Sequence, residues 1–273
     1  MPIDIRKRMH DWTTKIVQFL DYTSYALFNV YKFKPFPSKI QRILVVELLK
    51  IGDLIVATPV LRTLKRTYPD AEIDVLVDPS MVEVLKQNPY VTSIIPYKPD
   101  RQTRELLQQG RYDLGVILHT GSLKVSKLLL DARVRYRVGC APTGLTYGKG
   151  FFLNKKVSPF CKMQHKIEDN LDVIRSIGLT SAGSHVEVHT TEQSEKKAKI
   201  LLKGKKSPFI GIAATSQHWT QRWYPERFAE VANYYIAKKG ATIIFFGTEK
   251  EHDQVKDIIQ RIDNKKNVLN LCG

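Results

Sequence analysis

The chain has 273 residues, 43% of them hydrophobic and 26% charged, a composition typical of a soluble globular protein that excludes a collagen-like or broadly disordered one. Its three cysteines are widely spaced and offer no disulfide framework or zinc site. No run of about 20 apolar residues predicts a membrane span. The formal net charge of +16 favours a partner that carries negative charge.

The positive charge is concentrated in one stretch of the chain. Between Arg101 and Lys166 there are 13 lysines and arginines against three acidic residues. Such a stretch forms either a solvated basic face or a surface that meets phosphates, anionic lipid or an acidic substrate. No nucleic-acid-binding motif accompanies it, so the sequence does not favour nucleic acid as a partner.

Residues 1–38 have the pattern of a basic amphipathic N-terminal extension. Apolar and aromatic side chains recur at helical spacing from Trp12 to Tyr31, and lysines and arginines flank them. The pattern predicts a helix lying on an anionic membrane surface, and it fits a helix packed on the protein body or on a partner subunit equally well. Charged residues interrupt the N-terminus and no small-residue cleavage site follows, so we expect no signal peptide.

A regular alternation of strands and helices predicts a Rossmann-like domain over residues 39–180. Continuous apolar runs such as RILVVEL are typical of parallel strands covered on both faces, and segments with helical periodicity separate them. The alternation predicts strands at 42–48, 72–78, 91–97, 112–120 and 133–140, and helices at 54–68, 81–87, 101–109, 122–131 and 165–178. Residues 142–164 are rich in Gly, Pro and Lys and predict an irregular loop.

A crossover linker, residues 181–206, leads to a second alternation over residues 207–273. The first helix of this part has Pro225 at its start and Gly240 beyond its end. Three strands and two helices make half of a doubly wound domain and would leave apolar surface uncovered, so we expect this C-terminal domain to be truncated. The predicted strands are 208–214, 241–247 and 267–271, and the helices are 225–240 and 249–262.

Three stretches of the chain carry a resemblance to a known family. They are ILVVELLKIGDLIVATPVLRTLKRTYPDAEIDVLV, GIAATSQHWTQRWYPERFAEVA and IIFFGTEKEHDQV, in this order. The first holds Gly52-Asp53 followed by Thr58-Pro59, and the second leads through a polar loop into a helix start. Over residues 41–273 the chain resembles glycosyltransferase family 9, the ADP-heptose:lipopolysaccharide heptosyltransferase family.

The resemblance implies a fold, an activity and a set of partners. The fold is α/β of the GT-B type, with two doubly wound parallel-sheet domains that face a cleft. The N-terminal domain holds the acceptor and the C-terminal domain the nucleotide sugar. The activity is an inverting transfer of a heptose or related sugar from a nucleotide diphosphate, ADP-heptose in this family, to a lipopolysaccharide-core or similar anionic, lipid-linked saccharide. It implies no cofactor, no metal, and a cytoplasmic protein in peripheral contact with the inner face of the inner membrane.

Asp53 is the candidate catalytic residue. It falls where the first predicted strand opens into the first helix, and aspartate at such a place is a favoured helix N-cap. Ligands of parallel sheets bind beyond the carboxyl ends of the strands, and an inverting transfer needs a base for the acceptor hydroxyl. The resemblance places the family's catalytic aspartate here, and both roles are compatible. Gly52 is expected to turn the backbone tightly and to let the acceptor approach, with a plain turn glycine as the alternative.

Further acceptor-binding candidates follow the fourth predicted strand. His119 ends this strand, and Lys124 and Lys127 lie on the next predicted helix, where they can meet phosphates of the acceptor. The alternatives are a capped histidine at a strand end and two solvated lysines. None of these candidates forms a metal cluster with another His or Cys at ligand spacing.

The donor-binding candidates lie in the second domain. The resemblance assigns Thr215 and Ser216 to the phosphates of the nucleotide, and a polar loop between a strand and a helix suits a diphosphate. The family carries a lysine where this chain has Gln221, and Arg222 is the candidate to replace its charge. Glu251 follows the next strand and is expected to bind the ribose or the sugar, or else to be a first-turn surface glutamate.

Two departures from the family leave a second interpretation open. Glutamine at position 221 supplies no charge to a leaving diphosphate. The Asp-x-Gly-x-x-His stretch of the family is absent from the sequence, which ends in NVLNLCG. The alternative to an active transferase is therefore a non-catalytic or truncated binding protein derived from the GT-B fold.

Overall fold

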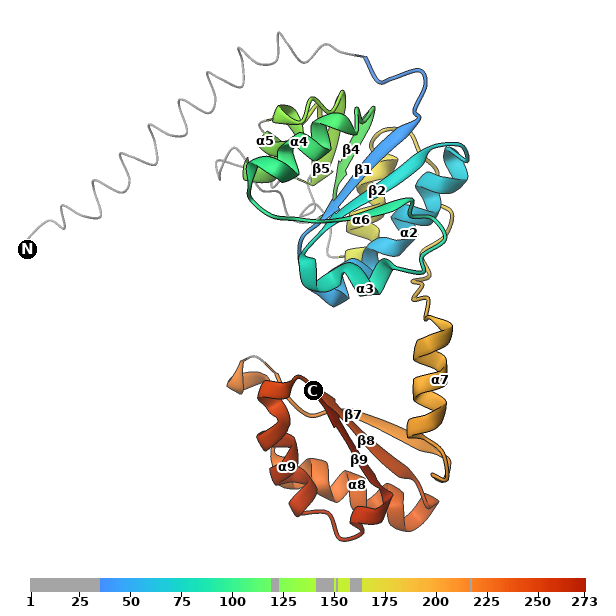
Figure 1. Ribbon diagram of the computed structural model, residues 1–273, viewed down its shortest axis with the longest axis vertical. Coiled ribbons are helices and arrows are strands. Elements are labelled where there is room, and N and C mark those ends of the chain that lie inside the picture. The colour runs from blue at the N-terminus through green and yellow to red at the C-terminus, as the bar shows by residue number, and fades with distance from the viewer. Residues whose placement is uncertain (1–34, 119–122, 141–149, 151, 158–163, 217) are drawn as a thin grey trace, which may run out of the picture. The chain divides into compact units, whose positions relative to one another are not determined.

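The computed structural model describes residues 35–118, 123–140, 150, 152–157, 164–216 and 218–273. The chain forms two compact units, Met1–Thr190 and Thr191–Gly273 (Figure 1). The boundary falls inside the predicted linker, residues 181–206. Most of the predicted N-terminal extension, residues 1–34, lies outside the described residues.

The first unit is built on a six-stranded parallel sheet with the order β3-β2-β1-β4-β5-β6. This is the strand order of doubly wound nucleotide-binding sheets, and it confirms the predicted fold of this part. The last strand lies in the segment that the sequence predicted as an irregular loop, so that prediction was wrong there. The strands are β1 Arg42–Glu47, β2 Glu72–Val77, β3 Ser93–Pro96, β4 Leu114–Ile117, β5 Tyr136–Cys140 and β6 Lys155–Val157.

Helices cover both faces of this sheet (Figure 1). The side chains of a strand alternate between faces, so Val45 packs with one helical layer and Val46 with the other. Buried leucines of α2, α3 and α6 form the first layer with Val45, and buried leucines of α4 and α5 form the second with Val46. The helices are α2 Ile51–Thr67, α3 Val82–Leu85, α4 Arg101–Gln109, α5 Leu123–Asp131 and α6 Lys166–Arg175, and a 3₁₀ turn, Pro79–Met81, precedes α3.

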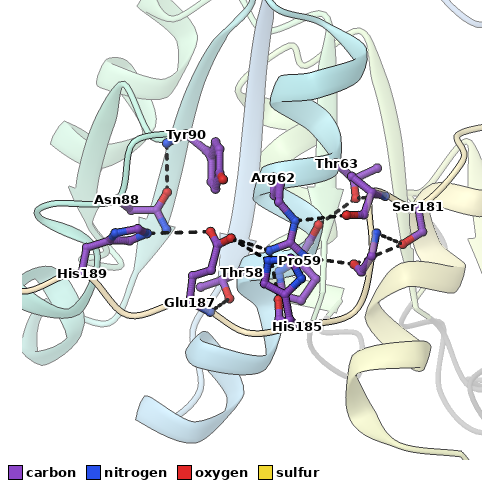
Figure 2. Close-up of polar contacts among 12 residues, drawn as sticks. Thr58, Pro59, Arg62, Thr63, Asn88, Tyr90, Ser181, His185, Glu187 and His189 are labelled. Atoms are coloured by element: carbon purple, nitrogen blue, oxygen red, sulfur yellow. Dashed lines mark hydrogen bonds and ion pairs between the residues drawn. The ribbon is translucent and has the colours of Figure 1, made fainter.

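The segment that leaves the first unit is held against α2 by one buried arginine (Figure 2). The Arg62 side chain is 0% exposed and donates hydrogen bonds to the backbone carbonyls of Ala182, Gly183 and His185 at 3.0–3.3 Å. Its Nη1 also lies 2.7 Å from Oε1 of Glu187. One guanidinium thus satisfies three carbonyls and a carboxylate, and it fixes residues 182–187 on the helix.

The Thr58-Pro59 pair of α2 takes part in the same attachment (Figure 2). Proline has no N–H, so the carbonyl of Ile55 lacks its helical partner, and the Thr58 hydroxyl donates to it at 2.7 Å. The same hydroxyl accepts a hydrogen bond from the backbone N–H of Glu187 at 3.1 Å. The pair that carries part of the family resemblance therefore has a structural role in this chain.

The second unit has a three-stranded parallel sheet with the order β7-β8-β9. Pro225 stands at the first position of α8 and Gly240 follows it in the left-handed conformation, which confirms both predicted helix ends. The helix α7 lies in the predicted linker and was not anticipated. The elements are α7 Glu192–Leu201, β7 Phe209–Ala213, α8 Pro225–Lys239, β8 Thr242–Gly247, α9 His252–Gln260 and β9 Val268–Cys272, with 3₁₀ turns Trp219–Gln221, Glu249–Glu251 and Lys265–Asn267.

One face of this smaller sheet is covered by α8 and α9. Ile212 and Phe245 point to that face and are buried with Ala232 and Val255. Phe209 and Phe246 point to the opposite face and are 41% and 48% exposed. The expected exposure of apolar surface in this part of the chain is confirmed. None of the described helices has the length and the apolar character needed to cross a membrane.

Candidate functional site

The carboxyl ends of β1 and β4 form the edge at which the predicted catalytic residue lies. Leu118 follows β4 and donates its backbone N–H to the carbonyl of Val46 in β1 at 3.1 Å. The helix α2 starts four residues after the end of β1. Ligands of parallel sheets bind beyond this edge, so the side chains at this edge are candidates for ligand binding and catalysis.

Asp53 lies in the first turn of α2 and is not the cap of the helix. The helix begins at Ile51, three residues earlier than predicted, and Lys50 is its N-cap residue without a side-chain cap. The first helical bond already closes from the N–H of Leu54 to the carbonyl of Lys50 at 3.1 Å. The N-cap interpretation of Asp53 is therefore wrong, although a carboxylate in the first turn is still favoured by the helix dipole.

The Asp53 carboxylate is available for a ligand. Its side chain is partly exposed, and within the described parts of the chain no hydrogen bond or ion pair holds it. Gly52 is helical, so the expected tight turn at this position is wrong. A Cβ added at Gly52 would meet nothing within 4 Å, so this side of the first turn is open. The Asp53 carboxylate is therefore accessible from this side of the first turn.

Glu47, the last residue of β1, is a second acidic residue at this edge, and the sequence analysis did not single it out. It is 1% exposed, its Oε1 accepts the N–H of Leu49 at 3.0 Å, and its Oε2 is buried without a hydrogen-bond partner among the residues that the structure describes. Burial raises the pKa of Glu47 to about 7, assisted by the negative charge of Asp53, while the Leu49 hydrogen bond and Lys166 act in the opposite direction. A charged residue that ends an apolar strand was the signal that could have identified it.

The start of α6 brings a positive charge to the same edge. His165 caps this helix by accepting the N–H of Ile167 at 3.2 Å. The next residue, Lys166, directs its Nζ to the carbonyl of Leu118 at 3.5 Å. Acidic and basic groups from β1, α2 and α6 are thus assembled at one end of the sheet.

The other predicted acceptor-binding residues are His119, Lys124 and Lys127. His119 lies outside the described residues. Lys124 and Lys127 are exposed on α5, and Lys127 forms an ion pair with Asp131 of the same helix at 2.7 Å. The pair is on the surface and is easily exchanged for a ligand, so the role of both lysines stays a prediction.

The five predicted donor-binding residues lie together in the second unit. Thr215, just beyond β7, donates its hydroxyl to Oε1 of Glu251 at 2.5 Å. The other oxygen of Glu251 accepts the backbone N–H and the hydroxyl of Thr248, at 2.7 and 2.8 Å. The Thr215 hydrogen bond, followed by those from Thr248, holds the pKa of Glu251 below its ordinary value. An ionised carboxylate thus links the loop after β7 to the turn after β8.

The loop after β7 is folded back on itself by polar contacts. The Ser216 hydroxyl donates to Oε1 of Gln221 at 2.9 Å, and Nε of Arg222 donates to the carbonyl of Ser216 at 2.8 Å. Both Gln221 and Arg222 are exposed. Arg222 is therefore oriented toward the loop next to Gln221, where its positive charge is available to an anion.

A pocket of about 440 Å³ adjoins this loop within the second unit. Trp223 lies at its wall, 49% exposed, with its ring edge-to-face on Phe228 at 5.1 Å between centroids. Across the described residues, no three His, Cys, Asp or Glu side chains are grouped as metal ligands. The lining residues of the pocket are Ala214, Arg222, Trp223, Pro225, Asp253, Gln254, Asp257 and Ile258.

Comparison with known protein families finds a match. The family described as glycosyltransferase family 9 (heptosyltransferase) matches residues 101–273, well over half of the chain. The Gly52-Asp53 and Thr58-Pro59 pairs lie before the matched segment. The matched segment comprises the second half of the first unit and the whole of the second unit.

Individual relatives with the same type of name extend the similarity toward the N-terminus. Lipopolysaccharide heptosyltransferase 3 of Escherichia coli is 25% identical over 217 residues, which are 73% of this chain and 62% of the relative. Lipopolysaccharide heptosyltransferase 2 of Salmonella typhimurium is 24% identical over 256 residues, 85% of this chain and 71% of the relative. The chain thus spans less than two thirds of the length of the first of these relatives.

Solved structures show the same fold. A family 9 glycosyl transferase from Veillonella parvula has a TM-score of 0.71 at 23% identity, covering 85% of this chain and 69% of its own. Escherichia coli ADP-heptose lps heptosyltransferase II has a TM-score of 0.69 at 21% identity, covering 85% and 73%. The fold is therefore α/β and GT-B-like.

Proposed function

The chain belongs to glycosyltransferase family 9, the heptosyltransferase family, and from this membership we propose that the protein is an inverting glycosyltransferase. It moves a heptose or related sugar from a nucleotide diphosphate, ADP-heptose as the preferred candidate, to a lipopolysaccharide-core or similar lipid-linked saccharide. The names of its relatives, which are lipopolysaccharide heptosyltransferases, support this choice of donor and acceptor. Peripheral contact of a cytoplasmic enzyme with the inner membrane surface is part of the proposal.

The observation that carries the proposal is the free carboxylate of Asp53 in the first turn of α2. In the proposed reaction the acceptor hydroxyl oxygen attacks the anomeric carbon while its proton passes to Asp53. The bond from that carbon to the diphosphate breaks, and the diphosphate leaves with the bonding electrons. The helix N-terminus holds the carboxylate in place, and its partial exposure leaves it open to the hydroxyl.

The donor is proposed to bind at the polar loop after β7. Thr215 and Ser216 offer hydroxyl and backbone groups to the diphosphate, and Arg222 offers the positive charge that Gln221 lacks. Glu251 is ionised by its hydrogen bonds and can accept the hydroxyls of a ribose or sugar. The acceptor is proposed to approach Asp53 past Gly52, with His119, Lys124 and Lys127 as further contacts.

The direct test is transfer itself. Purified protein is incubated with ADP-heptose and a heptose-deficient lipopolysaccharide core, and the product is identified by mass spectrometry and its anomeric configuration by NMR. Inverted product that depends on the protein supports the proposal. A retained configuration contradicts the proposed single displacement, and absence of product with these and with related nucleotide sugars contradicts the activity.

The second candidate function is a non-catalytic binding protein of the same fold, and glutamine at position 221 favours it. Both candidate functions require that the loop after β7 binds an anionic nucleotide. Isothermal titration with ADP measures this binding, and a protein that does not bind ADP fits neither candidate. ADP binding without transfer selects the binding protein, and ADP binding with transfer selects the enzyme.

Lysine at position 221 should strengthen nucleotide binding. In Gln221→Lys a positive charge is added beside Ser216, and a charge-assisted hydrogen bond to a diphosphate is worth enough to tighten ADP binding by roughly tenfold. The dissociation constant is measured by titration. The matched control is Thr220→Lys, which adds the same charge to the preceding exposed residue. Equal tightening in both variants would show a general charge effect and would contradict a phosphate position at residue 221.

A further inference from the structure

We propose that the amino-terminal edge of the sheet in the first unit docks on an anionic lipid bilayer. This is the edge at which the parallel strands begin, opposite the carboxyl edge where Asp53 lies. The proposal assigns a surface to the membrane contact of the proposed function, and it rests on that function only for its effect on transfer. The surface, called the basic edge below, consists of Arg111, Arg133, Arg135 and Lys155.

The strand order brings these four residues to the starts of three neighbouring strands. Arg111 precedes β4, and Arg133 and Arg135 precede β5. The backbone N–H of Arg135 donates to the carbonyl of Tyr112 at 3.0 Å, and Lys155 begins β6, the next strand of the sheet. Neighbouring strands are about 4.8 Å apart, so β4 and β6 are separated by about 10 Å. Charges spread over this distance match a surface with many phosphates better than a single phosphate.

The positive charges of the basic edge are not neutralised by the protein. All four side chains are exposed, and none of them has an ion pair within the described part of the chain. Acidic residues in the same connections are already engaged. Asp113 accepts two backbone N–H groups at 2.9 and 3.1 Å, and Asp131 pairs with Lys127 at 2.7 Å. An anionic partner therefore meets unpaired positive charge at this edge.

The backbone supplies a separate reason to assign a use to two of these side chains. Arg111 follows α4 and Arg133 follows α5 in the left-handed conformation, with φ of 46° and 58°. Glycine is the usual residue at such a place because it has no Cβ, and Gly240, with φ of 62°, fills it after α8. The helix dipole favours a cation after α4 and α5, but it gives no reason for Arg135 and Lys155, which lie at strand starts. Attraction to an external anionic surface accounts for all four residues.

The basic amphipathic extension, residues 1–38, joins the first unit at the same edge. The ring of Phe36 packs edge-to-face on the ring of Tyr136, the first residue of β5, at 5.1 Å between centroids. The N–H of Gln41 donates to Asp113, just before β4, at 2.9 Å. A sequence with the pattern of an interfacial helix thus leads directly into an unpaired basic surface. This combination favours a lipid surface over a nucleic acid or a soluble anion.

The experiment is co-sedimentation of the full chain with vesicles of phosphatidylglycerol and phosphatidylcholine, and with vesicles of phosphatidylcholine alone. A basic residue near an anionic surface contributes roughly a fivefold change in binding, so a triple variant should bind the anionic vesicles about 100-fold more weakly. Its substitutions are Arg111→Gln, Arg133→Gln and Arg135→Gln. The matched control should bind within a few-fold of the wild type, because it removes the same charge from exposed lysines of the second unit, by Lys203→Gln, Lys206→Gln and Lys256→Gln.

A single variant keeps the test valid where the triple variant folds poorly. Arg133→Gly removes one charge and relieves the left-handed conformation, so the unfolding free energy should not fall, and binding to the anionic vesicles should weaken roughly fivefold. Unchanged vesicle binding in this variant and in the triple variant overturns the inference. Loss of binding to a DNA duplex with unchanged vesicle binding also overturns it, in favour of a nucleic-acid surface.

The transfer assay separates this inference from the proposed function. We expect the triple variant to transfer sugar to a lipid-free core saccharide at the wild-type rate, and to the same saccharide anchored in anionic vesicles at a lower rate. Vesicle binding that depends on the basic edge, in a protein without any transfer, upholds the inference and rejects the proposed function. Transfer in a protein whose vesicle binding ignores the basic edge does the reverse.

Discussion

Asp53→Asn is expected to lower kcat of sugar transfer by about 10²–10⁴-fold, the usual contribution of a general base. Asparagine has nearly the same shape and keeps the first turn of α2 intact, but its amide cannot accept the proton of the acceptor hydroxyl. Because no hydrogen bond or ion pair within the described residues depends on this carboxylate, the fold should be unaffected. The measurement is the rate at saturating donor and acceptor.

The control for this prediction is Asp70→Asn, which removes an exposed aspartate from the loop after α2 in the same unit. It should transfer at the wild-type rate. Circular dichroism and ADP titration should be the same for all three proteins, since the proposed donor residues lie in the second unit. An Asp53→Asn enzyme within a few-fold of the wild-type rate would contradict the assignment of the base.

Arg62→Ala is expected to cost the first unit about 3–5 kcal/mol of unfolding free energy, the cost of breaking a buried ion pair from one side. The substitution leaves a cavity in the packed face of α2. It also removes the donors to the carbonyls of Ala182, Gly183 and His185 and the partner of Glu187. The measurement is urea unfolding followed by far-UV circular dichroism.

The matched control is Arg66→Ala, an exposed arginine in the last turn of the same helix, which should change the unfolding free energy by less than about 0.5 kcal/mol. A pH series adds a signature. Burial raises the pKa of Glu187, but Arg62 and His185 outweigh it and hold that pKa below its ordinary value. The ionised Glu187 therefore contributes fully to the unfolding free energy above the ordinary glutamate pKa, and this contribution is lost as the pH falls through the lowered pKa of Glu187. The unfolding free energy of Arg62→Ala should lack this decrease at acid pH. Equal stabilities of the two variants would contradict the attachment.

The sequence alone predicted the parallel sheet of the first unit because its strands are continuous apolar runs, and burial on both faces produces that pattern. It did not predict β6, whose residues Lys155–Val157 are mostly polar and form a strand only by pairing with β5. It also missed α7, although Thr191 caps that helix by accepting the N–H of Ser194. Elements defined by long-range pairing or by few apolar contacts leave little trace in periodicity.

The candidate site shows the same limit at the level of single residues. The donor residues came from the resemblance, and the structure brings Thr215 and Glu251 into direct contact, 36 positions apart in the chain. Glu47 was not singled out, although a charged residue that ends an apolar strand marks it in the sequence, and its burial appears only in the structure. The predicted start of α2 was three residues too late, because Gly52 was expected to form a turn before the helix. The backbone N–H groups of the first turn have no partner within the helix, so a glycine there leaves the helix intact.

The attachment of residues 182–187 to α2 has a consequence for limited proteolysis. A protease must bind its target in an extended form with the backbone carbonyls free, and here Arg62 occupies those of Ala182, Gly183 and His185. The segment is therefore a poor substrate even though several of its side chains are exposed and it has no regular secondary structure. Cleavage between the two units should occur after Glu187. The N-terminal fragment should then retain residues 182–187 hydrogen-bonded to Arg62.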